Sequence, residues 1–267
     1  MTFQPVVPFG GFAGWQFLQR TQEFQRAAFD ASPVRQRDVD YFQETIGTIT
    51  SAEELVSDRR LLTVSLGAFG LDEDINNRFF IQRVLEDGTQ STEALANRLT
   101  DTRYRSIAEA FGFGNGVIPN TLRTGFGERI AGAFLERQFE IGVGNTDQNL
   151  RLSLTLEREL PEIAARNLQN DTKWLTIMGN PPLRRVFEVA LGLPDAFGTL
   201  DIDRQLEEFK DRAARAFGTS ELSLIAEPET LSDVTRTFLA RAQIADGLNA
   251  SLGPANAALT LLSQAAL

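Results

Sequence analysis

The chain has 267 residues, a formal net charge of −10 and a sequence pI near 4.7. A chain of this length can bury a core large enough to fold without a metal or a disulfide, and its acidic balance argues against nucleic acid or anionic membrane surfaces as partners. It has no cysteine and no histidine, so disulfides, thiolate nucleophiles, the commonest zinc ligand and the usual general base near neutral pH are all excluded. We therefore expect no cofactor and no metal site, and we predict that the protein is not an enzyme.

Membrane insertion and classical secretion are also not expected. No apolar run approaches the ~20 residues of a membrane-spanning helix, so no integral membrane segment is predicted. The N-terminus lacks the basic start and continuous apolar segment of a secretory signal peptide. We expect a cytoplasmic protein that is exported only if a different kind of export machinery recognises it.

Residues 1–14 are apolar but contain two prolines and three glycines, which predicts an extended arm rather than a helix. Two interpretations remain open. The arm packs on its own body, or it docks on a protein partner, because its apolar side chains would otherwise be exposed to water. The candidate docking residues are Phe3, Val6, Val7, Phe9 and Phe12.

Helical spacing of apolar residues dominates the chain after the arm. Ser32-Pro33 is typical of a helix start, Ser51 and Glu54 have the spacing of a capping box, and Thr121 is a candidate N-cap for a long helix. The other predicted helices cover residues 15–29, 72–85, 92–99, 147–168, 181–192, 201–217 and 231–245.

One helix pattern occurs three times: an aspartate followed at fixed offsets by a basic, a bulky apolar and a β-branched residue. An aspartate at an N-cap accepts hydrogen bonds from the first helical turn, bulky residues three apart share a face, and a following glycine suits a left-handed C-cap. We therefore interpret Asp58, Asp101 and Asp171 as structural helix N-caps rather than a carboxylate cluster. The three copies are Asp58-Arg60-Leu61-Val64, Asp101-Arg103-Tyr104-Ile107 and Asp171-Lys173-Trp174-Ile177.

The predicted fold class is all-α, an irregular multi-helix bundle built from repeated helical hairpins. Leucines alternate over residues 150–156, which favours a strand, but the length of the apolar segment favours a helix that is bent or broken near Pro161. The Gly-rich turn 112–116 divides a first helical half, 15–116, from a second, 117–246, and both halves form one compact domain. Residues 247–267 are predicted to be a loosely ordered C-terminal tail.

Two segments resemble ligand-binding loops only in part. Asp72–Asn76 starts like a calcium loop, but Asn77 stands where glycine is required and Arg83 where glutamate is required. The turn 112–116 lacks the spacing of a dinucleotide or phosphate loop. We interpret the acids as favoured by a helix start and the turn as a flexible connection.

Three glutamates, Glu157, Glu159 and Glu162, lie on one predicted helix. A glycosidase acid requires a second carboxylate across a cleft, which the sequence does not reveal. Tyr104 and Trp174 are predicted to be core or near-core anchors, since they stand at the offset that Leu61 has in the first copy.

A set of short motifs is spread over residues 30–245: Asp40-Tyr41-Phe42, Ser51-Ala52-Glu53-Glu54-Leu55 with Asp58, Arg60-Leu61-Leu62, Ala68-Phe69-Gly70-Leu71, Val84-Leu85-Glu86, Ala96-Asn97-Arg98-Leu99, Asp101-Thr102-Arg103-Tyr104 and Ala110-Phe111-Gly112. Through these motifs the chain resembles the bacterial family known as domain of unknown function 1217, whose members are often encoded among flagellar genes without an established activity. The resemblance implies a non-catalytic protein–protein interaction or assembly protein associated with the flagellum and with motility.

This resemblance implies a protein partner, which is expected to be flagellar. It does not decide whether the chain forms an oligomer. The implied location is cytoplasmic, or flagellum-associated if the protein is exported without a cleavable signal peptide. Two alternatives remain: an exported structural component of the flagellum, and a carboxylate-dependent cell-wall glycan hydrolase.

Overall fold

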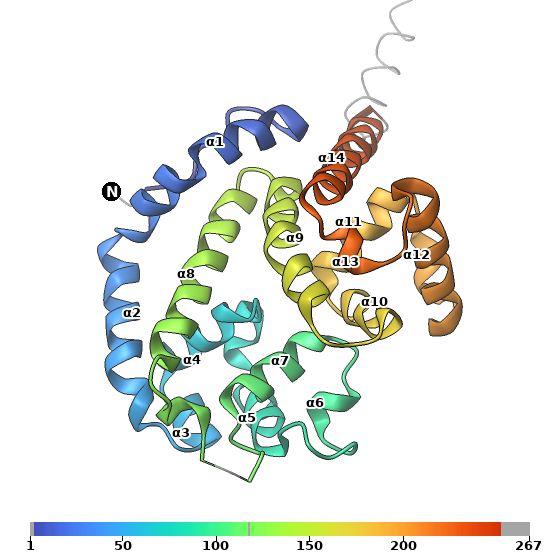
Figure 1. Cartoon of the computed structure of the whole chain (residues 1–267). Helices are drawn as coiled ribbons and strands as arrows, with labels where there is room; N and C mark the ends of the chain where they lie inside the picture. The colour runs from blue at the N-terminus through green and yellow to red at the C-terminus, as the bar shows by residue number, and fades with distance from the viewer. Residues whose placement is uncertain (1–2, 117, 252–267) are drawn as a thin grey trace, which may run out of the picture. The chain divides into compact units, whose positions relative to one another are not determined.

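A computed structural model describes residues 3–116 and 118–251, and every regular element within these ranges is a helix (Figure 1). The fold is therefore an all-α multi-helix bundle, as predicted. Short 3-10 turns η1 (Ile46–Thr48), η2 (Asp72–Asn76), η3 (Asn120–Leu122) and η4 (Asp195–Thr199) connect some of the helices. The helices are α1 (Gly11–Asp30), α2 (Pro33–Thr45), α3 (Ala52–Ser57), α4 (Arg59–Ala68), α5 (Arg78–Asp87), α6 (Leu95–Arg98), α7 (Thr102–Phe111), α8 (Phe126–Gly144), α9 (Gln148–Ala165), α10 (Asn170–Met178), α11 (Pro181–Leu191), α12 (Ile202–Phe217), α13 (Leu222–Ile225) and α14 (Pro228–Ser251).

The chain divides into two compact units, each built from three separate stretches. Unit 1 contains the chain up to Val6, Arg20–Thr146 and Thr176–Pro181. Unit 2 contains Val7–Gln19, Asp147–Leu175 and the chain from Pro182 onward. The units therefore do not divide at residue 116, where the two halves were predicted to meet. The predicted tail, 247–267, begins inside α14, and its remainder, 252–267, lies outside the described residues.

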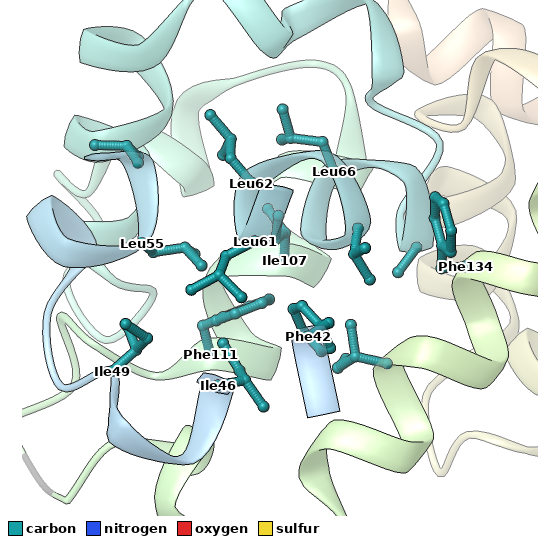
Figure 2. Close-up of a cluster of buried hydrophobic side chains, with 14 of the residues drawn as sticks. Phe42, Ile46, Ile49, Leu55, Leu61, Leu62, Leu66, Ile107, Phe111 and Phe134 are labelled. Atoms are coloured by element: carbon teal, nitrogen blue, oxygen red, sulfur yellow. The ribbon is translucent and has the colours of Figure 1, made fainter. Parts of the chain in front are cut away.

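The core of unit 1 forms around α4, which is apolar on most of its surface and is therefore covered by other helices. Figure 2 shows Phe42 and Ile46 lying with Leu61 of α4 and Phe111 of α7, all of them fully or almost fully buried. Helix α8 packs closely on α4 at Gly67, where a Cβ atom would lie 2.6 Å from the ring of Phe134.

The core of unit 2 is centred on Trp174, which is completely buried. Its ring packs edge-on against Phe187 of α11 at 5.2 Å between centroids and tilted against Phe209 of α12 at 5.9 Å. The indole Nε1–H donates a hydrogen bond to the carbonyl oxygen of Ser220 at 2.8 Å, so the polar end of the side chain is also satisfied.

Helix α9 explains the alternating leucines. Residues 150, 152, 154 and 156 are all buried because α9 is covered on more than one face, with α13 and α14 packed against it. A helix that is buried on several faces does not keep a polar stripe. Alternating leucines in its sequence are then no evidence for a strand. The helix continues through Pro161 to Ala165 and is not broken there.

The glycine turns after the first and third copies of the repeated pattern share one hydrogen-bond arrangement. The Leu71 N–H donates to the Leu66 carbonyl at 2.9 Å, and the Leu193 N–H donates to the Glu188 carbonyl at 2.8 Å. Gly70 and Gly192 between them have φ of +69° and +64°, as the Schellman helix ending requires.

Arginines from elsewhere in the same unit hold these turns, two in unit 1 and one in unit 2. In unit 1, Arg137 Nε donates to the Ala68 carbonyl at 2.8 Å, and Arg103 donates to the carbonyl of Gly70. In unit 2, Arg212 Nη1 donates to the Gly192 carbonyl at 2.9 Å. The last carbonyls of both helices are therefore satisfied by cationic donors, which also suit the negative end of the helix dipole.

Three local predictions differ from the structure. The helix α1 begins at Gly11, inside the segment predicted to be extended. The predicted helix 72–85 is split into η2 and α5, and Phe79 on α5 is 89% exposed. Thr121 does not cap α8, whose N-cap is Gly125. Instead its buried hydroxyl donates to the Ile49 carbonyl at 2.6 Å.

Candidate functional site

The structure places two of the three predicted aspartates at helix N-caps. The Asp58 carboxylate accepts hydrogen bonds from the backbone N–H groups of Arg60 and Leu61 at 2.8 and 3.1 Å. Asp101 likewise accepts from the N–H of Arg103 at 2.9 Å. Both carboxylates therefore serve the local backbone, as helix-capping residues do.

Asp171 is not an N-cap, and this prediction is wrong. Helix α10 begins at Asn170, so Asp171 lies within its first turn. Its carboxylate accepts from Lys210 Nζ of α12 at 2.5 Å. The start of α10 is fixed by tertiary contacts of Asn170, whose side chain donates to the Ser220 carbonyl and accepts from the Leu222 N–H, both at 3.0 Å.

Asp58 is also part of a small polar cluster with Tyr41 and Arg60. The Tyr41 hydroxyl donates to Asp58 Oδ2 at 2.5 Å, and the Arg60 guanidinium lies 4.0 Å from the centre of the Tyr41 ring. Burial of the Asp58 carboxyl opposes its ionisation, but the Tyr41 hydroxyl and the two backbone N–H donors outweigh burial and hold its pKa below the usual value. Arg60 donates to the Arg37 carbonyl at 2.8 Å, so its guanidinium is engaged within unit 1.

Replacing Asp58 by alanine is expected to lower the free energy of unfolding by about 1–2 kcal/mol at pH 7, because α4 loses its cap. Because the pKa of Asp58 is lower in the folded protein than in the unfolded chain, its ionised carboxylate stabilises the fold at pH values above the unfolded-chain pKa. This stabilisation is lost as the pH falls below about 4. The stability difference between the two proteins should therefore shrink in acid. Urea unfolding followed by circular dichroism at about pH 7 and pH 3 measures it, and an equal difference at both values would contradict the assignment.

The calcium-like segment is occupied by protein donors. Tyr104 O–H donates to Asp74 Oδ2 at 2.6 Å, and Gln138 Nε2 donates to Asp72 Oδ1 at 2.9 Å. Burial and the bond to Asp74 raise the pKa of the Tyr104 hydroxyl, so it remains a donor. Within the described residues, no group of three or more acidic side chains could hold a metal ion.

The first part of the arm is fixed to unit 1 by its backbone. The Val6 N–H donates to Gln25 Oε1 at 2.7 Å, and Gln25 Nε2 donates back to the Val6 carbonyl at 3.1 Å. Gln25 is buried on α1, and Pro5 is buried beside Gly142 of α8. Phe3 is half-buried, whereas the Val6 side chain is 55% exposed. The arm therefore packs on its own unit while presenting an apolar side chain to solvent.

The second part of the arm belongs to unit 2. Val7 is half-buried, and Phe9 is 60% exposed. Phe12 lies within α1 and is half-buried, with the Arg236 guanidinium 5.8 Å from its ring centre. A Cβ atom on Gly14 would lie 1.8 Å from the Phe9 carbonyl oxygen, so only glycine allows the backbone to pass this closely.

Two of the three glutamates on α9 are held by neighbouring side chains. Glu157 accepts from Gln19 Nε2 at 2.7 Å, and burial raises the pKa of its carboxyl. Glu159 is buried and accepts from Arg158 Nη1 at 3.1 Å. Glu162 is exposed. A raised pKa suits a general acid, but the contacts of Glu157 and Glu159 are those of structural side chains.

A shallow groove on unit 1 was not anticipated from the sequence. It is lined by Thr48, Ile49, Glu53, Glu54, Ser57 and Asp58. Its polar groups serve the capping box, in which Glu54 accepts from the Thr50 and Ser51 N–H groups at 2.7 and 3.3 Å. These bonds hold the pKa of Glu54 below its usual value, the Thr50 N–H contributing most. The groove is therefore built by helix capping.

Comparison with known proteins identifies a family and a fold. The family described as "Protein of unknown function (DUF1217)" matches residues 68–231. The crystal structure of protein AGR_C_984 from Agrobacterium tumefaciens is 21% identical, with a TM-score of 0.73 over 91% of this chain and 99% of that one. No curated protein matches the chain. Over the described residues, none of the helices has the length and apolarity that crossing a membrane would require.

Proposed function

This chain belongs to the DUF1217 family, and on that premise we propose that it is a non-catalytic protein–protein interaction or assembly protein of the bacterial flagellum. The flagellar setting is supported by the family resemblance, whose members are often encoded among flagellar genes. The interaction role is supported by the N-terminal arm. A protein without cysteine or histidine, whose capping carboxylates serve its own backbone, is better suited to recognition than to catalysis.

The observation that carries the proposal is the combination of a fixed backbone and exposed side chains in the arm. Both backbone hydrogen-bonding groups of Val6 are paired with Gln25, yet the Val6 side chain is 55% exposed. Phe9, three residues later, is 60% exposed. At Val6, a backbone held in place before binding avoids most of the ordering entropy that a free terminus loses on binding.

The chemistry of the arm indicates the kind of partner. Pro5 and Pro8 lack a backbone N–H and favour extended backbone, so recognition rests on side chains rather than on strand pairing. The partner is therefore a protein that offers apolar pockets to Val6 and Phe9. Such pockets fit apolar side chains, and a few well-packed residues carry most of the binding energy in interfaces.

Capture of partners from flagellated cells tests this role. We expect full-length protein to capture a flagellar component, and we expect Val6→Ser and Phe9→Ser to weaken capture at least tenfold. Phe79→Ser is the matched control, because Phe79 is 89% exposed on α5 and its loss removes a similar apolar surface elsewhere. All three variants should unfold at the wild-type temperature, since the replaced side chains are mostly exposed.

Two outcomes would overturn the proposal. Undiminished capture by the Val6 and Phe9 variants would remove the arm from the interface. Lysis of peptidoglycan by the purified protein, abolished by Glu157→Gln, would replace the interaction role with the hydrolase alternative. Appearance of the protein in the culture medium of flagellated cells, dependent on residues 1–13, would instead favour the exported structural component.

A further inference from the structure

The turn at residues 112–116 ends in a dipeptide that is chemically labile. Asn115-Gly116 is the only place in the chain where glycine follows asparagine. Glycine has no Cβ atom to shield its backbone nitrogen, so this nitrogen can approach the side-chain amide of the preceding asparagine. Gly116 is exposed, and a Cβ atom placed on it would meet nothing within 4 Å. The nitrogen that would act as the nucleophile is therefore open to solvent.

The side-chain amide of Asn115 is held with its carbonyl polarised. The Thr89 N–H donates to Asn115 Oδ1 at 3.0 Å, while none of the described residues bonds to Nδ2. Negative charge develops on Oδ1 when a nucleophile attacks Cγ, and a backbone N–H already aimed at that oxygen stabilises this charge, as in an oxyanion hole. The fold therefore favours attack at Cγ and leaves the amide nitrogen free to depart.

A dipeptide of related chemistry beside this turn is shielded. Asp87-Gly88 lies against it, since a Cβ atom on Gly88 would lie 2.5 Å from Asn115 Oδ1. Both oxygens of the Asp87 carboxylate are held, Oδ1 by Arg83 at 2.9 Å and Oδ2 by the Leu95 N–H at 3.2 Å. Gly88 is also buried, which keeps solvent from its backbone. The structure thus exposes one of the two dipeptides and protects the other.

We propose that Asn115 is a site of spontaneous deamidation in the folded protein. Solvent base removes the proton of the Gly116 N–H, and this nitrogen attacks Cγ of Asn115. The N–Cγ bond forms and the Cγ–Nδ2 bond breaks, so that Nδ2 takes a proton from water and leaves as ammonia. Water then opens the resulting cyclic imide: attack at Cγ gives aspartate, and attack at the main-chain carbonyl carbon gives isoaspartate. The net reaction consumes one water and releases one ammonia.

The isoaspartate product cannot keep the contacts of the turn. Its main chain runs through Cβ and Cγ of residue 115 and is longer by one methylene. The main-chain carbonyl of Asn115, which accepts from Gln90 Nε2 at 3.0 Å, becomes a side-chain carboxylate. The former amide oxygen, which accepts from the Thr89 N–H, becomes part of the main chain. Deamidation therefore loosens the attachment of the turn to residues 89 and 90, and it does so independently of the proposed flagellar partner.

Incubation of the full-length protein at mildly alkaline pH, followed by peptide mapping with mass spectrometry, tests the site. We expect Asn115 to convert at least tenfold faster than Asn145, which is exposed but is followed by threonine, and to give both aspartate and isoaspartate. Gly116→Ala should slow conversion at least tenfold, because its methyl group shields the nitrogen. Gly125→Ala is the matched control and should convert at the wild-type rate. Gly116 and Gly125 have φ of +66° and +79° with open space at the Cβ position, so both variants carry similar backbone strain.

Several results would overturn the site. If Asn115 stays intact while Asn145 converts, the turn protects the dipeptide. Conversion of Gly116→Ala at the wild-type rate would exclude attack by the Gly116 nitrogen, and equal slowing by Gly125→Ala would assign the effect to backbone strain. Conversion confined to urea-unfolded wild type would show that the fold shields Asn115. This last comparison needs no variant, so the test does not depend on how well Gly116→Ala folds.

Discussion

Replacing Trp174 by alanine is expected to lower the free energy of unfolding of unit 2 by about 3–5 kcal/mol, the range for large-to-small changes at fully buried aromatic residues. Trp174 is 0% exposed and contacts the rings of Phe187 and Phe209, so its loss leaves a cavity that three helices line. The Ser220 carbonyl also loses the indole donor. Chemical unfolding followed by circular dichroism at 222 nm, the usual helix signal, measures the change, since fluorescence would also follow Trp15.

Trp174→Phe separates packing from hydrogen bonding at this site. It keeps an aromatic ring against Phe187 and Phe209 but removes the indole donor to Ser220. The Ser220 carbonyl keeps its bond from Asn170 Nδ2 at 3.0 Å, so loss of the indole bond costs about 0.5–1.5 kcal/mol. We expect it to be intermediate between wild type and Trp174→Ala. A Trp174→Ala protein as stable as wild type would show that this residue does not organise unit 2.

Gly114→Ala is expected to destabilise unit 1 by roughly 2–4 kcal/mol, from backbone displacement and lost hydrogen bonds. A Cβ atom at Gly114 would lie 2.2 Å from the Glu86 carbonyl oxygen and 2.3 Å from the Gly88 nitrogen. Both are backbone atoms, so no side-chain rotation relieves the overlap. The turn must move, and Asn115 then loses its bonds with the Thr89 N–H, at 3.0 Å, and the Gln90 amide, also at 3.0 Å.

Gly132→Ala is the control for this change. Gly132 lies inside α8 with nothing within 4 Å of its Cβ position. Alanine there should stabilise the helix by about 0.5–1 kcal/mol, because glycine is entropically unfavourable in a helix interior. Unfolding of the two variants under the same conditions should therefore shift in opposite directions. If Gly114→Ala leaves the stability unchanged, the turn can move without cost. It would then be the flexible connection that the sequence analysis predicts.

Local helix chemistry was readable from the sequence where it depends only on near neighbours. The capping box of Ser51 and Glu54 forms as its spacing predicts, and Asp58 caps α4 through bonds within three residues. Asp171 has the same neighbours in sequence but lies inside α10, because Asn170 bonds to Ser220 and Leu222 about 50 residues away. The start of that helix is set by tertiary contacts that no local pattern contains.

Exposure was the least predictable property. Phe79 lies in the predicted helix 72–85, yet it is 89% exposed, because it is two, five and six residues from the buried Ile81, Val84 and Leu85 and so lies on another face of α5. Ile244 was likewise assigned to a predicted helix, and nothing in the pattern showed that it would be 63% exposed. For the arm, the sequence showed which residues are apolar. It could not show that Gln25 fixes the Val6 backbone while the Val6 side chain stays exposed, because that pairing depends on the fold.

The threading of the chain through its two units has a consequence for its synthesis. Unit 1 includes Thr176–Pro181, and the Gly179 carbonyl there accepts bonds from the N–H and hydroxyl of Thr102 at 2.8 and 3.2 Å. Unit 2 starts near the N-terminus, at Val7, and includes buried Trp15 and Leu18. On the ribosome, unit 1 is therefore incomplete until Pro181 has emerged. Trp15 and Leu18 cannot be buried in unit 2 until most of that unit has been translated. No single cut in the gene yields either unit intact.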